Sequence, residues 1–264
     1  MEDKVSLNEV TIKARKDFFE LLKKSWTEFQ KNDKKFEAND IRAHLFSIYS
    51  TSNLWLLIHL DTFFEMLNEK DTKIKNYMNL NPRSRIQYLS QHDTINRISY
   101  VTKVMFDVED FIKTIMKGIE KSPHGKYYQF TKDLLTELQI NDIQSHKILN
   151  APYQIRNSLH NGGYAYHDFE IKLRDNQYNF IKGEQLKFTG WNHLYIFFDE
   201  LIDLLITIVN KPEIQKIQSI PHTIRQSHKQ SDLGRFNTIH EQKMKRHSSF
   251  LTRIPLDSQQ IRVE

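Results

Sequence analysis

The chain has 264 residues, a formal net charge of +5 and no cysteine, so we exclude a disulfide framework, a thiolate nucleophile and a Cys-ligated metal. The first residues form no apolar leader, and the longest apolar runs, such as Leu201 to Val209, fall well short of the roughly 20 residues that span a bilayer. These features predict a soluble cytoplasmic protein with no membrane segment.

The positive charge is concentrated near the C-terminus. Residues 221–264 carry eight Lys/Arg against four Asp/Glu, whereas the other 220 residues carry thirty against twenty-nine. The nearly neutral body means that the pI of about 9.1 does not by itself argue for nucleic-acid binding. We expect a helical domain over residues 1–219 and a flexible basic tail over residues 220–264. Three cations of the tail form a candidate RNA-binding cluster: Lys243, Lys245 and Arg246.

Helix dominates the predicted structure, because the chain has only seven glycines and six prolines and its apolar residues recur every three or four positions. A cap at Asn39-Asp40 starts the second helix, and the polar step over residues 50–53 could bend or split it. Pro152 could interrupt the later helix Asp142–Asn161. The expected helices are Leu7–Lys31, Ile41–Asn68, Arg83–Leu89, Asp93–Lys121, Tyr127–Leu138, Asp142–Asn161 and Trp191–Asn210.

After Gly162-Gly163, apolar residues recur at every second position instead of every third or fourth. Phe169, Ile171 and Leu173 alternate with charged residues, and Asp175-Asn176 supplies a turn, so we predict a β-hairpin at about residues 167–188. The predicted fold class is therefore all-α. It is a helical bundle with one hairpin inserted before the last long helix, followed by the basic tail.

The stretch APYQIRNSLHNGGYAYHDF, residues 151–169, contains the main candidate site. Arg156 and His160 lie one turn apart on the predicted helix and differ by about 40° around its axis, so both can reach one small anion. Imidazole can accept the proton of a ribose 2′-OH, and guanidinium can stabilise charge developing on phosphorus. A purely structural interpretation is also open. The helix dipole favours Arg and His near a C-terminus, and Asn-Gly-Gly ends helices.

The segment IRNSLHNGG, at the end of a late helix in an all-α chain, resembles the HEPN superfamily. Many of its members are metal-independent RNases of prokaryotic toxin and antiphage systems. The resemblance implies a phosphate-stabilising role for Arg156, an acid/base role for His160 and a supporting role for Asn157. It also implies a homodimer with two facing motifs, RNA as substrate, a neutralising or other partner protein, and no metal or cofactor.

The spacing of the motif differs from the family pattern. Three residues separate Arg156 from His160, whereas about four to six are common in the family, and the positions that would match hold Asn161, Gly162 and Gly163. The short spacing favours an alternative, a non-catalytic HEPN-like scaffold that binds RNA, a nucleotide or a partner protein. A third possibility is a helical interaction protein without a nucleic-acid role.

Two small groups of basic and aromatic residues could contact an RNA backbone. Arg83 and Arg85 lie near Tyr88, and Lys126 precedes two tyrosines. Two or three such charges are equally typical of a solvated surface.

The dipeptide His92-Asp93 suggests a different chemistry, because metal phosphohydrolases use an HD pair. They also need a second His and another Asp, roles that His59 with Asp61, and Asp107 or Asp110, could fill. A helix cap explains His92-Asp93 more simply, and His44 and His59 sit beside apolar residues as structural histidines do. We therefore expect no metal site.

Overall fold

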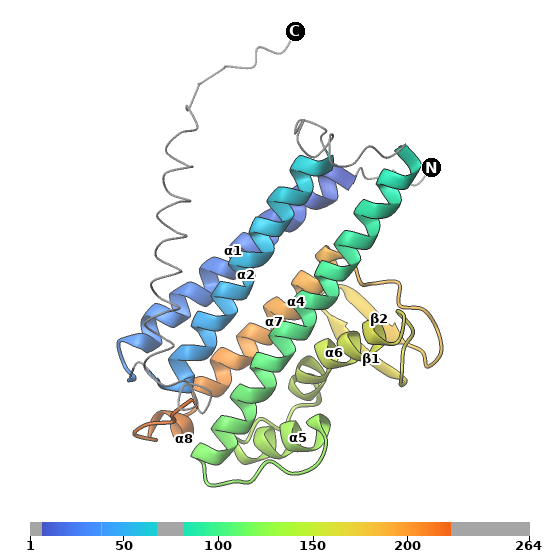
Figure 1. Ribbon diagram of the computed structural model, residues 1–264. Coiled ribbons are helices and arrows are strands. Elements are labelled where there is room, and N and C mark those ends of the chain that lie inside the picture. The colour runs from blue at the N-terminus through green and yellow to red at the C-terminus, as the bar shows by residue number, and fades with distance from the viewer. Residues whose placement is uncertain (1–6, 38, 68–81, 223–264) are drawn as a thin grey trace, which may run out of the picture. The chain divides into compact units, whose positions relative to one another are not determined.

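The computed structural model describes residues 7–37, 39–67 and 82–222 (Figure 1). The chain divides into two units, Met1–Pro221 and His222–Glu264. Across the described ranges the elements are helical except for one two-stranded antiparallel sheet, which confirms an all-α bundle with a hairpin inserted before the last long helix. The elements are α1 (Leu7–Asp33), α2 (Ile41–Leu67), α4 (Pro82–Gly118), α5 (Tyr127–Glu137), α6 (Ile143–His160), β1 (Phe169–Leu173), β2 (Asn176–Phe180), α7 (Trp191–Val209) and α8 (Pro212–Gln215).

α1 and α2 pack against each other along most of their lengths. The polar step on α2 neither splits nor ends the helix. The hydroxyl of Ser50 donates to the carbonyl of Phe46 at 2.7 Å and lies 2.9 Å from the hydroxyl of Ser25 on α1. Because the step is hydrogen-bonded within the helix pair, it is compatible with a buried continuous helix. Trp26 on α1 is 47% exposed.

α4 is a single helix of 37 residues, so the prediction of a short helix followed by a separate long one was wrong. His92 and Asp93 lie within it, and the cap interpretation of this pair was wrong too. Asp93 accepts a hydrogen bond from the indole N–H of Trp191 at 2.7 Å and forms an ion pair with Arg97 at 3.0 Å. His92 and Asp93 interrupt the apolar pattern of the sequence. Because Asp93 has these two partners, its carboxylate is satisfied within the packed structure and the helix continues.

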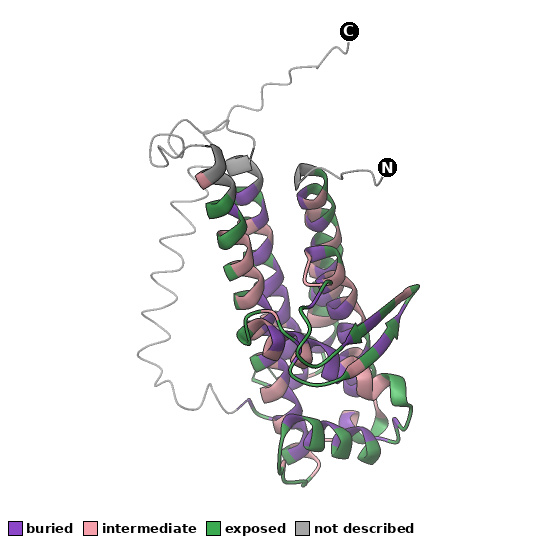
Figure 2. Cartoon of the chain, turned by 90° about the vertical axis from the view of Figure 1, so that its right-hand side faces the viewer, coloured by how far each residue is buried: buried purple, intermediate pink, exposed green. Residues whose placement is uncertain are grey.

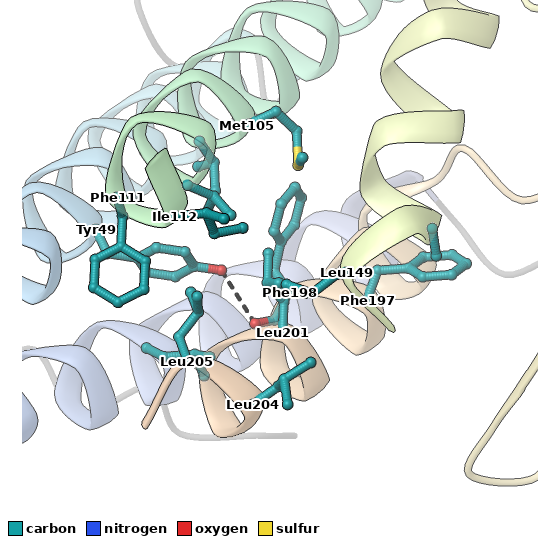
Figure 3. Close-up of a cluster of buried hydrophobic side chains, with 14 of the residues drawn as sticks. Tyr49, Met105, Phe111, Ile112, Leu149, Phe197, Phe198, Leu201, Leu204 and Leu205 are labelled. Carbon is teal, nitrogen blue, oxygen red and sulfur yellow. Dashed lines mark hydrogen bonds between the residues drawn. The ribbon is translucent and has the colours of Figure 1, made fainter. Parts of the chain in front are cut away.

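The hydrophobic core takes side chains from all the long helices and from the hairpin, and Figure 3 shows a part of it to which α2, α4, α6 and α7 contribute. The buried hydroxyl of Tyr49 donates to the carbonyl of Phe198 at 3.1 Å, the bond drawn in Figure 3. Burial raises the pKa of Tyr49 well above its usual value, which keeps the hydroxyl protonated as a donor. Figure 2 shows that the long helices bury one side and expose another. The core residues labelled in Figure 3 include Met105, Phe111, Ile112, Leu201 and Leu205.

A buried ion pair joins the start of α2 to the segment that follows α7. Asp40 caps α2 by accepting a bond from the backbone N–H of Arg42 at 2.9 Å, as the sequence predicted. Arg42 is fully buried and donates to both carboxylate oxygens of Asp40 and to the carbonyls of Ile214 and Ile217. Asp40 also accepts from the backbone of Ile220 at 2.9 Å. The packed body therefore includes Ile220.

The hairpin is shorter than predicted, and its turn lies one residue earlier. Leu173 pairs with Asn176, so the turn residues are Arg174 and Asp175, with Arg174 at a φ of 54°. β2 ends at Phe180, and Leu186 and Phe188 contact the core from the loop before α7. Beyond β2 the pairing continues as an isolated antiparallel bridge between Tyr164 and Gln185, with a hydrogen bond from the N–H of Leu186 to the carbonyl of Gly163 at 2.9 Å. In the described part of the chain, no helix is long and apolar enough to cross a bilayer.

Candidate functional site

The last turns of α6 position the candidate residues. Asp142 caps the start of α6 by accepting hydrogen bonds from the hydroxyl and the backbone N–H of Ser145, and these two bonds hold the pKa of the Asp142 carboxyl below its usual value. The helix runs through Pro152 without a break. Its end has the predicted glycine geometry. Gly162 has a φ of 67°, and the N–H of Gly163 donates to the carbonyl of Ser158 at 2.8 Å, the six-to-one bond of a Schellman motif.

One face of α6 anchors it, while the adjacent face carries the polar motif. Ile155 and Ser158 are buried, whereas Arg156 and Asn157 are half-buried and His160 is exposed. Arg156, Asn157 and His160 line one open cleft of about 580 Å³ between α6, α4 and the loop after the glycines. The other lining residues are Thr102, Phe106, Asn161 and Tyr166.

Arg156 has no counter-ion among the described residues. Its guanidinium carbon lies 5.3 Å from the ring centroid of Tyr153 and 5.6 Å from that of Phe106. The two rings offer cation–π attraction but accept no conventional hydrogen bond in the plane of the guanidinium. The Nε atom is buried and lacks a hydrogen-bond partner within the described ranges. An unsatisfied buried donor costs about 1–3 kcal/mol.

His160 is attached to α4 through one ring nitrogen. Its Nε2 lies 3.2 Å from the hydroxyl oxygen of Thr102, and the tautomer decides which group donates. This contact fixes the ring against α4 and leaves Nδ1 for a ligand or a proton. None of the cleft-lining residues is an Asp or a Glu, so the fixed charge at the cleft is that of Arg156.

Two large aromatic side chains are exposed at the same cleft. Phe106 on α4 is 58% exposed, and Tyr166 after the glycine turn is 57% exposed. Tyr166 also packs edge-to-face with His167, which does not line the cleft. Sequence reasoning missed Phe106, Tyr166 and Thr102. One available signal was Phe106 itself, because it is a large apolar residue that lies off the buried stripe of α4.

The predicted RNA-binding cations are not brought to this cleft by the described structure. Lys126 is exposed at the N-cap of α5 and is not among the lining residues. Arg83 and Arg85 lie in the first turn of α4, and their side chains are outside the described residues. Three further candidates, Lys243, Lys245 and Arg246, also lie outside the described residues.

In the metal hypothesis, Asp61 and Asp93 have other partners, whereas the Nε2 of His59 is buried without a hydrogen-bond partner among the described residues. The His59 and His92 rings lie 5.1 Å apart, and burial lowers the pKa of His59, with a smaller contribution from His92. Asp93 is held by Trp191 and Arg97, as described above, and Asp61 pairs with Arg15. Over the ranges that the structure describes, no group of three or more His, Asp or Glu side chains is placed to hold a metal ion.

Within the described residues, the cleft combines a cation without a counter-ion, an exposed imidazole that contacts the hydroxyl of Thr102, and exposed aromatic surface. Searches of protein-family models, curated proteins and solved structures found no match to this chain, so its function has to be inferred from the cleft itself.

Proposed function

We propose that the protein is a HEPN-like, metal-independent endoribonuclease that cleaves RNA in the cleft containing Arg156 and His160. One observation carries the proposal. Among the residues that the structure describes, Arg156 has no counter-ion and lines one cleft with the exposed His160, and none of the described lining residues is a carboxylate. The resemblance of IRNSLHNGG to the HEPN motif adds the expectation of a toxin or effector role in prokaryotic defence, with a neutralising partner protein.

The proposed reaction uses the RNA's own hydroxyl as the nucleophile. His160 removes the proton of the 2′-OH, and the 2′-oxygen attacks the adjacent phosphorus. The bond from phosphorus to the 5′-oxygen breaks, which leaves a 2′,3′-cyclic phosphate on one fragment and, after protonation, a 5′-OH on the other. Arg156 hydrogen-bonds the non-bridging oxygens as their charge grows, and Asn157 supports the phosphate with its amide.

A single imidazole cannot act as the base and, in the same step, as the acid for the leaving oxygen. We therefore propose a two-fold homodimer in which the second protomer's motif protonates the 5′-oxygen. Static light scattering at micromolar protein concentration tests this assembly. A monomer at that concentration, combined with full cleavage activity, would contradict it.

The decisive experiment measures RNA cleavage in EDTA by the full-length protein and by His160→Ala. The wild type should produce 2′,3′-cyclic phosphate ends, and a 2′-deoxy substitution at the cleaved nucleotide should block cleavage. General acid–base catalysis typically contributes about 10²- to 10⁴-fold, so His160→Ala should lose at least that lower factor while its melting temperature stays unchanged. Cleavage that requires a divalent metal, or that survives His160→Ala, would overturn the proposal.

The scaffold remains the second candidate, and the three-residue spacing of the motif favours it. In this alternative the cleft binds RNA, a nucleotide or a partner protein without chemistry. The wild type would then leave RNA intact, while Arg156→Ala would still weaken binding of the RNA oligonucleotide. The scaffold would be supported if the wild type binds RNA without cleaving it and Arg156→Ala loses that binding.

A further inference from the structure

Two exposed rings at the cleft serve no purpose in the proposed phosphate chemistry. More than half of the surface of Phe106 and of Tyr166 is exposed, and both residues line the cleft. Exposed aromatic surface beside a cation is the combination with which proteins bind unpaired nucleobases, because a base stacks on the ring while its phosphate meets the charge.

We propose that Phe106 and Tyr166 form a nucleobase site next to the phosphate site of Arg156. The ligand is then a nucleotide unit whose base is free of its complementary strand. This inference rests on the proposed function only in so far as Arg156 binds the phosphate, and it holds for a scaffold as well as for a nuclease.

The geometry places the two parts within one nucleotide of each other. The guanidinium carbon of Arg156 lies 5.6 Å from the centre of the Phe106 ring, so a phosphate on Arg156 has this ring as its immediate neighbour. Phe106 retains 58% exposure despite this contact, which leaves ring surface for a base. Tyr166 comes from a different element, the loop after Gly163, and adds a second ring to the same cleft.

Amide groups supply hydrogen bonds beside the rings. Asn161 donates from its Nδ2 to the carbonyl of Tyr164 at 3.3 Å, which leaves its Oδ1 as an acceptor at the cleft. Asn157 presents a further amide, with both a donor and an acceptor. The edges of a base carry hydrogen-bond donors and acceptors. The two amides therefore suit a base that lies between the RNA backbone and α6.

A duplex is a poor fit to the same features. Its bases are stacked on each other and paired, so an exposed ring cannot stack on a base face without unpairing it. The site therefore selects single-stranded segments, loops or ends over continuous helix.

Binding to a fluorescent oligonucleotide tests the proposal without requiring cleavage. Full-length His160→Ala protein is titrated with a single-stranded RNA carrying 2-aminopurine, whose fluorescence falls when the base stacks. Loss of one stacking ring corresponds to about a 5- to 150-fold rise in Kd, which is the expected effect of Phe106→Ala and of Tyr166→Ala. Phe106→Tyr and Tyr166→Phe should keep tight binding, because each retains a ring.

The matched control is Phe19→Ala, which removes a 47% exposed phenylalanine of α1 that does not line the cleft and should leave Kd unchanged. An oligonucleotide with an abasic position separates the base from the phosphate. Phe106→Ala should hardly affect binding of this abasic strand. If Phe106→Ala weakens binding of the abasic and the intact strand equally, Phe106 acts only by positioning Arg156. That result would overturn its role in binding a base.

The two proposals fail in different ways. If the wild type leaves RNA intact but quenches 2-aminopurine, the nuclease proposal fails and the nucleobase site stands. If the double variant Phe106→Ala/Tyr166→Ala cleaves RNA as well as the wild type does, the nucleobase site fails and the nuclease stands. Equal affinity for a duplex and a single strand would also overturn the nucleobase site.

Discussion

Arg42 and Arg156 show two opposite uses of the same side chain. Arg42 is fully buried, lies 3.7 Å from the ring centroid of Phe36, and has its donors satisfied by Asp40 and by backbone carbonyls. Arg156 also lies over aromatic rings, but in the described structure it has neither a carboxylate nor a carbonyl partner. A guanidinium whose donors are all used stabilises the fold. One whose donors are left open is available to a ligand.

The largest effect that this comparison predicts is on stability at Arg42. Arg42→Ala leaves the carboxylate of Asp40 buried without its counter-ion, and breaking a buried pair in this way typically costs about 3–5 kcal/mol. Urea unfolding monitored by circular dichroism measures the loss. The matched variant Arg156→Ala should unfold within about 0.5 kcal/mol of the wild type, because it removes no ion pair. Equal destabilisation by the two variants would show that Arg156 is structural.

The second prediction concerns the function of Arg156. Arg156→Lys keeps the charge but cannot reproduce the planar, two-pronged hydrogen bonding of guanidinium to phosphate. By analogy with the loss of one transition-state donor, the cleavage rate should fall about 10²- to 10³-fold with little change in the urea midpoint. Single-turnover cleavage of a defined RNA is the measurement. Full activity in Arg156→Lys would mean that a point charge is enough, and that the geometry of the cleft is unimportant.

A smaller effect is expected at Thr102, which holds the imidazole of His160. Thr102→Val removes one neutral hydrogen bond of similar size and shape, worth about 0.5–1.5 kcal/mol, so kcat/KM should fall about two- to thirteenfold. Thr102→Ser keeps the hydroxyl and should restore most of the activity. If Thr102→Ser and Thr102→Val are equally impaired, the methyl packing of Thr102 matters and its hydrogen bond does not.

The smallest effect should follow deletion of residues 223–264. The deletion removes a net positive charge from the chain while leaving Asp40, Arg42 and Ile220 in place. RNA binding should weaken mainly at low salt, and the dependence of log K on log salt should flatten by about 0.7 for each lost contact to a single-stranded phosphate. An unchanged salt slope would exclude Lys243, Lys245 and Arg246 from RNA binding.

Much of the helical architecture could be predicted from apolar periodicity. The bounds of α5 and α7 differ from the expected ones by about a residue, because their stripes are regular and end at polar residues. The continuity of α4 could not be predicted. His92 and Asp93 interrupt its stripe, and the compensating partner, Trp191, lies 98 positions away. A local pattern contains no information about such a contact.

The candidate site was predictable only on its α6 side. The four-residue step from Arg156 to His160 and the following glycines are local signals, and the structure places both residues at one cleft. Thr102 and Phe106 come from α4, more than 40 positions earlier, and only the packing of α4 on α6 brings them there. The half of the cleft that anchors His160 and supplies a ring is therefore a product of tertiary structure.

Because the last turn of α6 is unbroken, the number of residues between Arg156 and His160 should matter more than the identity of those residues. Arg156 and His160 are connected by continuous helical backbone, which ends at the positive-φ glycines. Exchanging Leu159 for another helix-forming residue leaves the angle between Arg156 and His160 unchanged. Inserting one residue beside Leu159 rotates His160 by about 100° relative to Arg156 and carries it out of register with Thr102. Substitutions at Leu159 by other helix-forming residues should therefore be tolerated far better than insertion or deletion of a single residue beside it.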